Sequence, residues 1–212
     1  MKIGIIGATG KSGSKISAEA LIRGHEVIPL VRNASKLTDS KDSRYIEKDL
    51  YDLDFDDIKE LDVVVDAFNA PQGKEELHQT SLAHIVSLIQ GHDKPRLIVV
   101  GGAGSLYIDD TNTTRLMDTA TFPEEAKPTA LNMAKAFDLL SQTEDINWTY
   151  LSPSAFFNPE GERTGNYQLG QDILLTNSEG NSEVSYADFA LALVDEIENQ
   201  NFINQRITVC SE

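Results

Sequence analysis

The chain begins with MKIGIIGATGKSG, residues 1–13, and this stretch decides the fold. An apolar run at residues 3–6 leads directly into glycines at positions 7, 10 and 13, and a helical pattern follows. A strand, a glycine-rich turn and a helix in this order are typical of a pyrophosphate site. Glycine allows a tight reversal and a close approach of the main chain, and the N–H groups at the start of the helix face the anion.

This turn is the first candidate binding site. Its spacing is G-x-x-G-x-x-G rather than the commoner G-x-G-x-x-G, so we expect a different loop path with the same physical basis. The residues predicted to hold the diphosphate of a dinucleotide are Gly7, Thr9, Gly10, Lys11, Ser12 and Gly13. The alternative is a glycine-rich turn that serves packing alone.

Outside the turn, short β-branched runs alternate with helical patterns. Strands are predicted at residues 3–7, 26–31, 45–48, 63–67, 97–100, 149–152 and 206–209, and helices at 15–23, 77–89, 130–141 and 187–199. This alternation predicts an α/β fold with a doubly wound, mostly parallel sheet, the NAD(P)-binding Rossmann fold, in a single domain over residues 1–212. Two stretches interrupt the pattern: a long loop at 105–128, and an excursion at 155–181 that we expect to cover the substrate.

A cation follows the second predicted strand. Arg32 lies nineteen residues beyond Gly13, where a site specific for NAD usually has Asp or Glu on the ribose 2′-hydroxyl. A cation at this position suits a 2′-phosphate, so Arg32 favours NADP over NAD, and Lys36 is expected to assist. The alternative is an exposed arginine at a strand end.

Further candidate residues follow the third and fourth predicted strands. Because ligands bind at the carboxyl ends of strands in open α/β sheets, we expect the dinucleotide to contact these positions too. Asp49 is predicted at the adenine edge, and Phe68 and Asn69 at the ribose; Leu50 and Ala67 complete this set. Capping and packing are the alternative roles.

The composition excludes several classes of protein. With 18 Lys+Arg against 34 Asp+Glu, the net charge of −16 repels nucleic-acid phosphates, so binding through a basic patch is excluded. The apolar runs are too short to span a membrane. A single cysteine, Cys210, suits a reducing compartment, and early glycines interrupt any signal-peptide helix, so we expect a mature cytoplasmic protein.

The sequence contains no pattern for a metal or a hydrolytic triad. The four histidines are scattered, no His, Cys, Asp or Glu spacing resembles a zinc site, and we predict no metal. The acidic cluster at residues 52–57 is expected to be a solvated helix start. Ser152 and Ser154 lack the G-x-S-x-G elbow of hydrolases.

Several motifs together resemble a known family. They are Gly7–Gly13, Val31–Asn33, Asp49–Leu50, Val65–Ala67 and Val99–Leu106, followed by Leu151–Phe157, Arg163–Tyr167 and Ser185–Ala190. Over essentially its whole length the chain resembles the atypical short-chain dehydrogenases with NmrA-like NAD(P)H-binding domains. The later motifs are similar to bacterial members named as NADH-flavin reductases.

The resemblance implies further site residues. Residues after the fifth strand would line the cofactor, and residues after the sixth would present main chain near the nicotinamide carboxamide; these are Gly101, Gly102 and Ala103, and Pro153, Ser154 and Ala155. The chain departs from other short-chain dehydrogenases at their Tyr-x-x-x-Lys motif. Leu131 stands where the proton-donating tyrosine would precede Lys135 by four residues.

The missing tyrosine narrows the chemistry. Ketone reduction needs a general acid for the developing alkoxide, whereas a flavin or quinone delocalises the incoming charge and can take a proton from water. We therefore predict an oxidoreductase that passes a hydride from NADPH to a small conjugated acceptor, with FMN or FAD as a possible substrate. Ser105 is the candidate hydrogen-bond donor to this acceptor, and Tyr107 is a candidate substitute for the missing tyrosine.

Two other functions stay open from the sequence. A non-catalytic NmrA-like redox sensor, which reports the dinucleotide state to a protein partner, fits the missing acid–base residues equally well. Epimerisation would need the absent tyrosine and a larger substrate domain. The acceptor is not identified, and both a monomer and a homodimer are compatible with the sequence.

Overall fold

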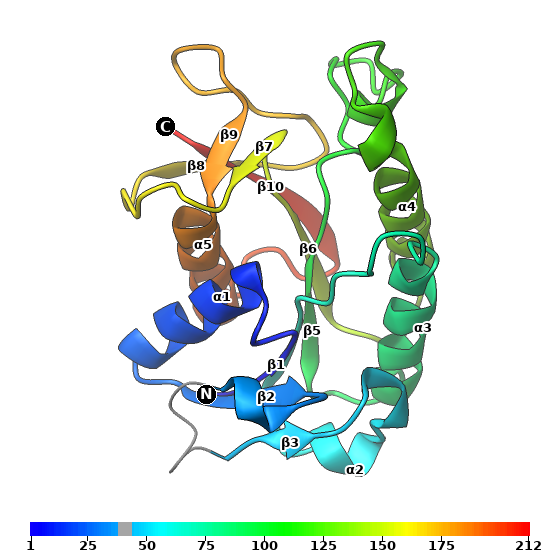
Figure 1. Ribbon diagram of the computed structural model, residues 1–212, viewed down its shortest axis with the longest axis vertical. Helices are drawn as coiled ribbons and strands as arrows, with labels where there is room; N and C mark the ends of the chain where they lie inside the picture. The colour runs from blue at the N-terminus through cyan, green and yellow to red at the C-terminus, as the bar shows by residue number, and fades with distance from the viewer. Residues whose placement is uncertain (38–43) are drawn as a thin grey trace.

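The sheet at the centre of the molecule has eight strands. The computed structural model describes residues 1–37 and 44–212, and the strand order is β3-β2-β1-β4-β5-β6-β10-β8 (Figure 1). The seven parallel strands are β1 (Lys2–Ile6), β2 (Glu26–Val31), β3 (Ile46–Glu47), β4 (Val63–Asp66), β5 (Arg96–Val100), β6 (Trp148–Ser152) and β10 (Gln205–Ser211). β8 (Tyr167–Gly170) runs antiparallel to β10 at the edge. The order reverses between β1 and β4, as the predicted doubly wound topology requires.

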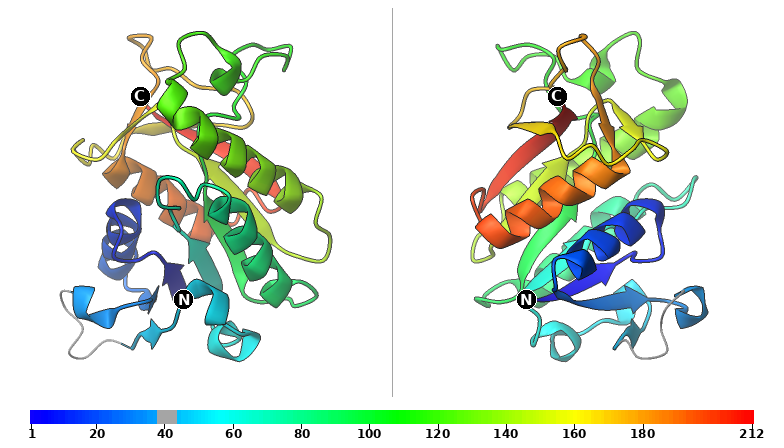
Figure 2. Two further views of the ribbon diagram at one scale, coloured as in Figure 1. Left: turned by 45° about the vertical axis from the view of Figure 1, so that its right-hand side comes forward. Right: turned by 90° about the vertical axis from the view of Figure 1, so that its left-hand side faces the viewer.

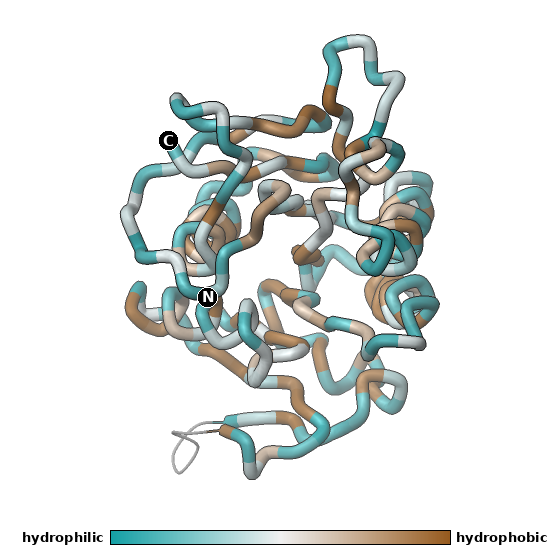
Figure 3. Tube along the Cα trace, turned by 45° about the horizontal axis from the view of Figure 1, so that its top comes forward, coloured by the Kyte–Doolittle hydropathy of each residue, from teal (hydrophilic) through white to brown (hydrophobic). Residues whose placement is uncertain are grey.

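Helices cover both faces of this sheet. α1 (Lys11–Ile22) and α5 (Tyr186–Asn199) lie side by side on one face, and α3 (Leu77–Ile89) and α4 (Lys127–Ser141) lie on the other (Figure 2). The short α2 (Phe55–Ile58) precedes β4. Each helical layer closes its own apolar core, with Phe189 central to one and Tyr150 to the other. In Figure 3 the hydrophobic segments follow the inner strands and helix faces, and hydrophilic segments gather at the connections.

Every predicted strand and helix is present; β2 and α3 have the predicted ends, and the ends of the others are shifted. α1 starts at Lys11 rather than at residue 15, because the residues after Gly10 already form its first turn. α4 starts at Lys127 rather than at 130, since Pro128 is tolerated in a first helical turn, where its missing N–H costs no bond. The third strand is shorter than predicted.

The loop at 105–128 and the excursion at 155–181 contain regular structure that the sequence did not predict. Short 3₁₀ helices occupy 116–118 and 124–126, and β7 (Phe156–Asn158) pairs with β9 (Glu183–Ser185) in a separate two-stranded sheet. The main chain of Tyr107 bonds to residues on both sides of Ile173: its N–H donates to Asp172 (2.8 Å) and its carbonyl accepts from Leu174 (2.8 Å). The two segments are therefore joined by a strand-like bridge.

Across residues 1–37 and 44–212, no helix combines the length and the apolar composition needed to cross a bilayer.

Candidate functional site

A pocket of about 600 Å³ opens at the carboxyl ends of β1 to β4, next to the point where the strand order reverses. Such a crevice is where ligands bind in open α/β sheets. Its lining includes nine of the predicted residues: Gly7, Thr9, Gly10, Arg32, Asp49, Leu50, Ala67, Phe68 and Asn69. The structure thus brings together the predicted diphosphate, ribose and adenine positions in one cavity.

The glycine turn has no room for side chains at two positions. Gly7 has φ of +76°, and a Cβ there would lie 2.5 Å from the carbonyl oxygen of Ala67. A Cβ on Gly13 would lie 2.2 Å from the carbonyl oxygen of Gly7. The turn is closed by a hydrogen bond from the N–H of Gly10 to that same oxygen (2.8 Å). These close approaches explain the sequence G-x-x-G-x-x-G, because both outer glycines are needed to pack α1 against β1 and β4.

The start of α1 is open to an anion. Gly10 occupies the N-cap and contributes no side-chain hydrogen bond to the first turn. Lys11 and Ser12 continue from it, and the N–H groups of the first turn have no partner within the helix. Their partial positive charge adds to that of the helix dipole at the edge of the pocket, whose lining reaches Gly10 but does not include Lys11, Ser12 or Gly13. The role of these three residues at a diphosphate stays a prediction.

Cations gather around the other end of the pocket. Arg32, Lys36, Lys48 and Lys74 line it together with a single carboxylate, Asp49, although the whole chain carries a net charge of −16. Lys48 is engaged by Asp57 (2.6 Å). Within 1–37 and 44–212, the other three cations form no ion pair, so their charges face the pocket or solvent.

Local hydrogen bonds hold the segment that carries Arg32. The side chain of Asn33 caps the 3₁₀ helix at 34–36 by accepting from the N–H of Ser35 (2.9 Å). The Glu47 carboxylate, from the neighbouring β3, accepts from the N–H of Ala34 (3.0 Å). The cations at positions 32 and 36 therefore extend from a main chain that is held by side chains at residues 34 and 35.

Asp49 has the capping role that was the alternative to an adenine contact. Its carboxylate accepts a hydrogen bond from the N–H of Tyr51 (3.1 Å) and so caps the 3₁₀ helix at 50–52. Asp49 also lines the pocket. The wall beyond it is apolar, with Leu50 and Leu53 on one side and Phe68 with Leu77 on the other. Such a wall is suited to a flat aromatic base.

The glycines after β5 are explained by packing. A Cβ on Gly101 would lie 2.1 Å from the ring of Tyr150, and one on Gly104 would lie 2.6 Å from the Cβ of Ala130. Gly102 has more space, 3.0 Å from the sulfur of Met133. Neither these residues nor Ala103 line the 600 Å³ pocket, so their contact with a dinucleotide stays a prediction.

The segment after β6 is also held by the protein itself. Pro153 and Ser154 are buried, and the Ser154 hydroxyl donates to the carbonyl of Val209 (2.9 Å). Ala155 is exposed, and its N–H donates to the hydroxyl of Ser182 (3.1 Å). The predicted proximity of this segment to the nicotinamide stays a prediction.

Ser105 is buried beneath the loop that follows it. Its hydroxyl accepts a hydrogen bond from Nη1 of Arg206 (3.0 Å). Nε of Arg206 donates to Asp172 (2.7 Å), and its guanidinium lies 4.5 Å from the ring centre of Phe137. Ser105 keeps its own proton for donation, and Tyr107 lies half-buried in the bridge described above. Their catalytic roles stay predictions.

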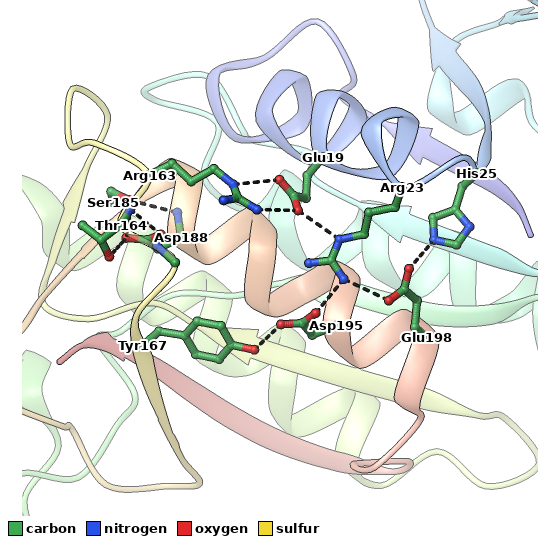
Figure 4. Close-up of polar contacts among 11 residues, drawn as sticks. Glu19, Arg23, His25, Arg163, Thr164, Tyr167, Ser185, Asp188, Asp195 and Glu198 are labelled. Atoms are coloured by element: carbon green, nitrogen blue, oxygen red, sulfur yellow. Dashed lines mark hydrogen bonds and ion pairs between the residues drawn. The ribbon is translucent and has the colours of Figure 1, made fainter.

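The Arg163–Tyr167 motif is tied to α1 and α5 (Figure 4). Arg163 binds the buried carboxylate of Glu19 in α1 through Nε (3.1 Å) and Nη2 (3.0 Å). The fully buried Asp188 in α5 accepts from the main-chain N–H groups of Thr164 (3.0 Å) and Gly165 (2.9 Å). We refer to these contacts as the α1–α5 clamp; they hold the excursion against the helix that begins at the phosphate turn.

Sequence reasoning missed Lys74 and Tyr51, which also line the pocket. Lys74 lies in the connection after β4, next to Gly73 with its φ of +81°. The proximity of Lys74 to the strand end that carries Phe68 and Asn69 was a usable signal.

The comparisons with known proteins agree with this geometry. The family model described as NAD(P)H-binding matches residues 7–200. The uncharacterized protein YwnB of Bacillus subtilis (strain 168) is 51% identical over 212 residues, which is 100% of this chain and 99% of that protein. The solved structure of SP1627 from Streptococcus pneumoniae TIGR4, a "putative NADH-flavin reductase" by name, is 45% identical with a TM-score of 0.94, and the match covers 100% of each chain. A Lactobacillus casei structure is 33% identical with a TM-score of 0.89, covering 100% of this chain and 99% of that one. These matches confirm the family resemblance and the Rossmann fold, and the chain belongs to the NAD(P)H-binding family.

Proposed function

We propose that the protein is a reductase that binds NADPH and passes a hydride to a flavin, quinone or similar conjugated acceptor. The observation that carries the cofactor assignment is the pocket of about 600 Å³, which joins an uncapped helix start to a cluster of cations at the sheet's switch point. The name of SP1627 supports a flavin as one acceptor. The missing Tyr-x-x-x-Lys motif favours acceptors that need no protein general acid.

The residues of the pocket fit a dinucleotide. The main chain from Gly7 to Gly13 would hold the diphosphate, since any Cβ at either end of this turn would collide with the neighbouring main chain. The apolar wall around Leu50 and Phe68 would hold the adenine ring. Arg32, assisted by Lys36 and Lys74, would bind the 2′-phosphate, because charge-assisted bonds to phosphate are about twice as strong as neutral ones.

On the acceptor side, the bound nicotinamide supplies the hydride and the protein supplies orientation. The bridge between Tyr107 and Ile173 joins the loop at 105–128 to the excursion at 155–181, so these segments would form one cover that excludes water from the acceptor. Ser105, fixed by Arg206, would orient a carbonyl of the acceptor with its remaining proton.

A turnover assay tests this function. Purified protein is mixed with NADPH and either FMN or a benzoquinone, and the absorbance of the reduced nicotinamide is followed. Catalysed loss of absorbance is the expected result. Tight dinucleotide binding without turnover on flavins and quinones would refute the reductase and support the redox sensor, which fits the same pocket.

The cofactor preference is tested separately with Arg32→Ala. A charge-assisted bond contributes about 1.5 to 3 kcal/mol, so the affinity for NADPH is expected to fall roughly tenfold or more while the affinity for NADH stays unchanged. Lys59→Ala is the matched control, because Lys59 pairs with Asp56 and does not line the pocket. An unchanged ratio of the two affinities in Arg32→Ala, measured by calorimetry, would exclude the 2′-phosphate role.

A further inference from the structure

A second, much smaller cavity lies directly behind the dinucleotide pocket. Its volume is about 20 Å³, enough for one water molecule. Phe68 belongs to the walls of both cavities and separates them. The polar groups that line the small cavity are Asp66 at the end of β4, His78 and Ser81 on α3, and Tyr150 on β6.

Two of these groups have unused hydrogen-bonding capacity. His78 is only 7% exposed, and its Nε2 is buried. This nitrogen has no hydrogen-bond partner among residues 1–37 and 44–212. The Asp66 carboxyl is 5% exposed and accepts one bond, from the N–H of Phe68 to Oδ1 (3.0 Å). Ser81 and Tyr150 are satisfied by carbonyl oxygens, those of His78 and Met133. A buried polar nitrogen without a partner is uncommon and indicates a missing ligand.

The protonation states of these groups suit a shared water. Burial raises the pKa of Asp66 to about 6, although the hydrogen bond from the N–H of Phe68 acts to lower it. Burial also lowers the pKa of His78, opposed by the nearby Glu75. Burial therefore favours the neutral form of both groups, the protonated acid of Asp66 and the neutral imidazole of His78. One water can then accept from the acid and donate to Nε2, and after ionisation of Asp66 it can donate to both.

Among the residues that the structure describes, no further charged group lines this cavity, and Glu75 acts on His78 from outside it. The remaining wall residues are Leu82 on α3, Val99 and Val100 on β5, and Met133 and Ala136 on α4, none of which titrates. Tyr150 is fully buried, and burial raises its pKa to about 12, so it stays neutral over the same range. Asp66 is therefore the group whose ionisation we expect to add a negative charge to the cavity as the pH rises through about 6.

We propose that this cavity is a binding site for one water molecule that joins the Asp66 carboxyl to Nε2 of His78, and that the site positions Phe68 at the wall of the dinucleotide pocket. Asp66 is then a positioning residue, because it holds the N–H of Phe68 and does not itself touch the dinucleotide. This second part rests on the proposed use of the 600 Å³ pocket. It predicts that ionisation of Asp66 weakens binding, since it places a buried negative charge behind a pocket that receives an anion.

The water site is tested in the free protein. Nuclear magnetic resonance of the Asp66 carboxyl carbon is expected to show titration near pH 6, and the nitrogens of His78 are expected to show a neutral ring with Nε2 as an acceptor. A high-resolution crystal structure is expected to show one water between the two groups. An empty cavity in that crystal structure would overturn the site, and an Asp66 that titrates near its ordinary value of 3.8 would overturn the pH-dependent coupling.

The coupling is tested by calorimetry across pH with NADH, because the 2′-phosphate of NADPH titrates in the same range. If binding changes the pKa of Asp66 by about half a unit to one unit, the affinity of the unaltered protein falls roughly threefold to tenfold between about pH 5 and pH 7.5. In Asp66→Asn, which keeps the acceptor for Phe68, the change is expected to be less than about twofold.

Asp62→Asn is the matched control, since Asp62 precedes the other end of the same strand and pairs with Lys94 (2.6 Å). It is expected to keep the pH dependence of the unaltered protein. NADH binding that is independent of pH in the unaltered protein would overturn the coupling without any variant. Failure to bind NADH or NADPH at any pH would instead refute the proposed pocket and the coupling with it, while the resonance measurement still decides the water site.

Discussion

Replacement of Glu19 by Gln would remove the charge at the centre of the α1–α5 clamp. The Glu19 side chain is 5% exposed, and its carboxylate accepts three hydrogen bonds from two guanidinium groups, those of Arg163 and of Arg23 (Nε, 2.9 Å). The hydrogen bonds from Arg163, opposed by burial, hold the pKa of Glu19 below its usual range. Gln keeps the shape of the side chain but can neither pair with two cations nor accept all of these bonds.

The size of the effect follows from the exposure of the partners. Breaking a fully buried ion pair costs about 3 to 5 kcal/mol, but Arg163 is 51% exposed and can recover hydration. We therefore expect Glu19→Gln to lower the free energy of unfolding by about 2 to 3 kcal/mol at pH 7. The pKa of Glu19 is lower in the folded protein than its ordinary value of 4.5. The carboxylate therefore contributes its full stabilisation above about pH 4.5, and this stabilisation is lost as the pH falls through the pKa of the folded state.

Urea unfolding followed by the fluorescence of Trp148, the only tryptophan, measures this change. Asp56→Asn is the control, since Asp56 pairs with Lys59 on the surface at 82% exposure, and its replacement is expected to leave the free energy of unfolding nearly unchanged. Equal effects of the two substitutions at pH 7 would refute the reasoning, and so would a loss for Glu19→Gln that persists undiminished at pH 3.

Three further substitutions test other parts of the fold. Gly13→Ala places a Cβ 2.2 Å from the carbonyl oxygen of Gly7 and is expected to cost about 2 kcal/mol or more in thermal unfolding and to abolish dinucleotide binding in calorimetry; normal binding would contradict the turn geometry. Glu196→Gln leaves the buried Arg96 without its ion-pair partner and is expected to cost about 3 kcal/mol in urea; a loss below about 1 kcal/mol would show that Arg96 finds another partner. Asp66→Asn is expected to raise the free energy of unfolding by about 3 kcal/mol at pH 8 but by only about 0.5 kcal/mol near pH 4, because the native state binds the Asp66 proton with a pKa of about 6 and the unfolded chain with 3.8; parallel curves of melting temperature against pH would refute this.

The fold was predictable because its signals are local. Gly7, Gly10 and Gly13 mark a turn between the first strand and a helix, and the β-branched runs that follow identify six more strands. β7, β8 and β9 could not be predicted, since each has only three or four residues and depends on partners far along the chain. The helices α1 and α4 begin earlier than predicted, because their first turns contain glycine and serine in one case and proline in the other.

The residues of the candidate site that directly follow parallel strands could be predicted from the sequence. Arg32 and Phe68 lie in the pocket because both follow parallel strands that end at the same edge. Lys74 was missed because the connection that carries it has no regular pattern. The burial of Ser105 depends on Arg206, a hundred and one residues away, and no local signal indicates such a contact.

The contrast between a cationic pocket and an acidic chain has a kinetic consequence. A nucleotide approaching from bulk solvent first meets the repulsion of a molecule with net charge −16, and it meets the attraction of Arg32, Lys36 and Lys74 only within about 8 Å at physiological ionic strength. Added salt suppresses the distant repulsion first and the nearby attraction later. The association rate is therefore expected to pass through a maximum as salt is raised, whereas the dissociation rate increases throughout.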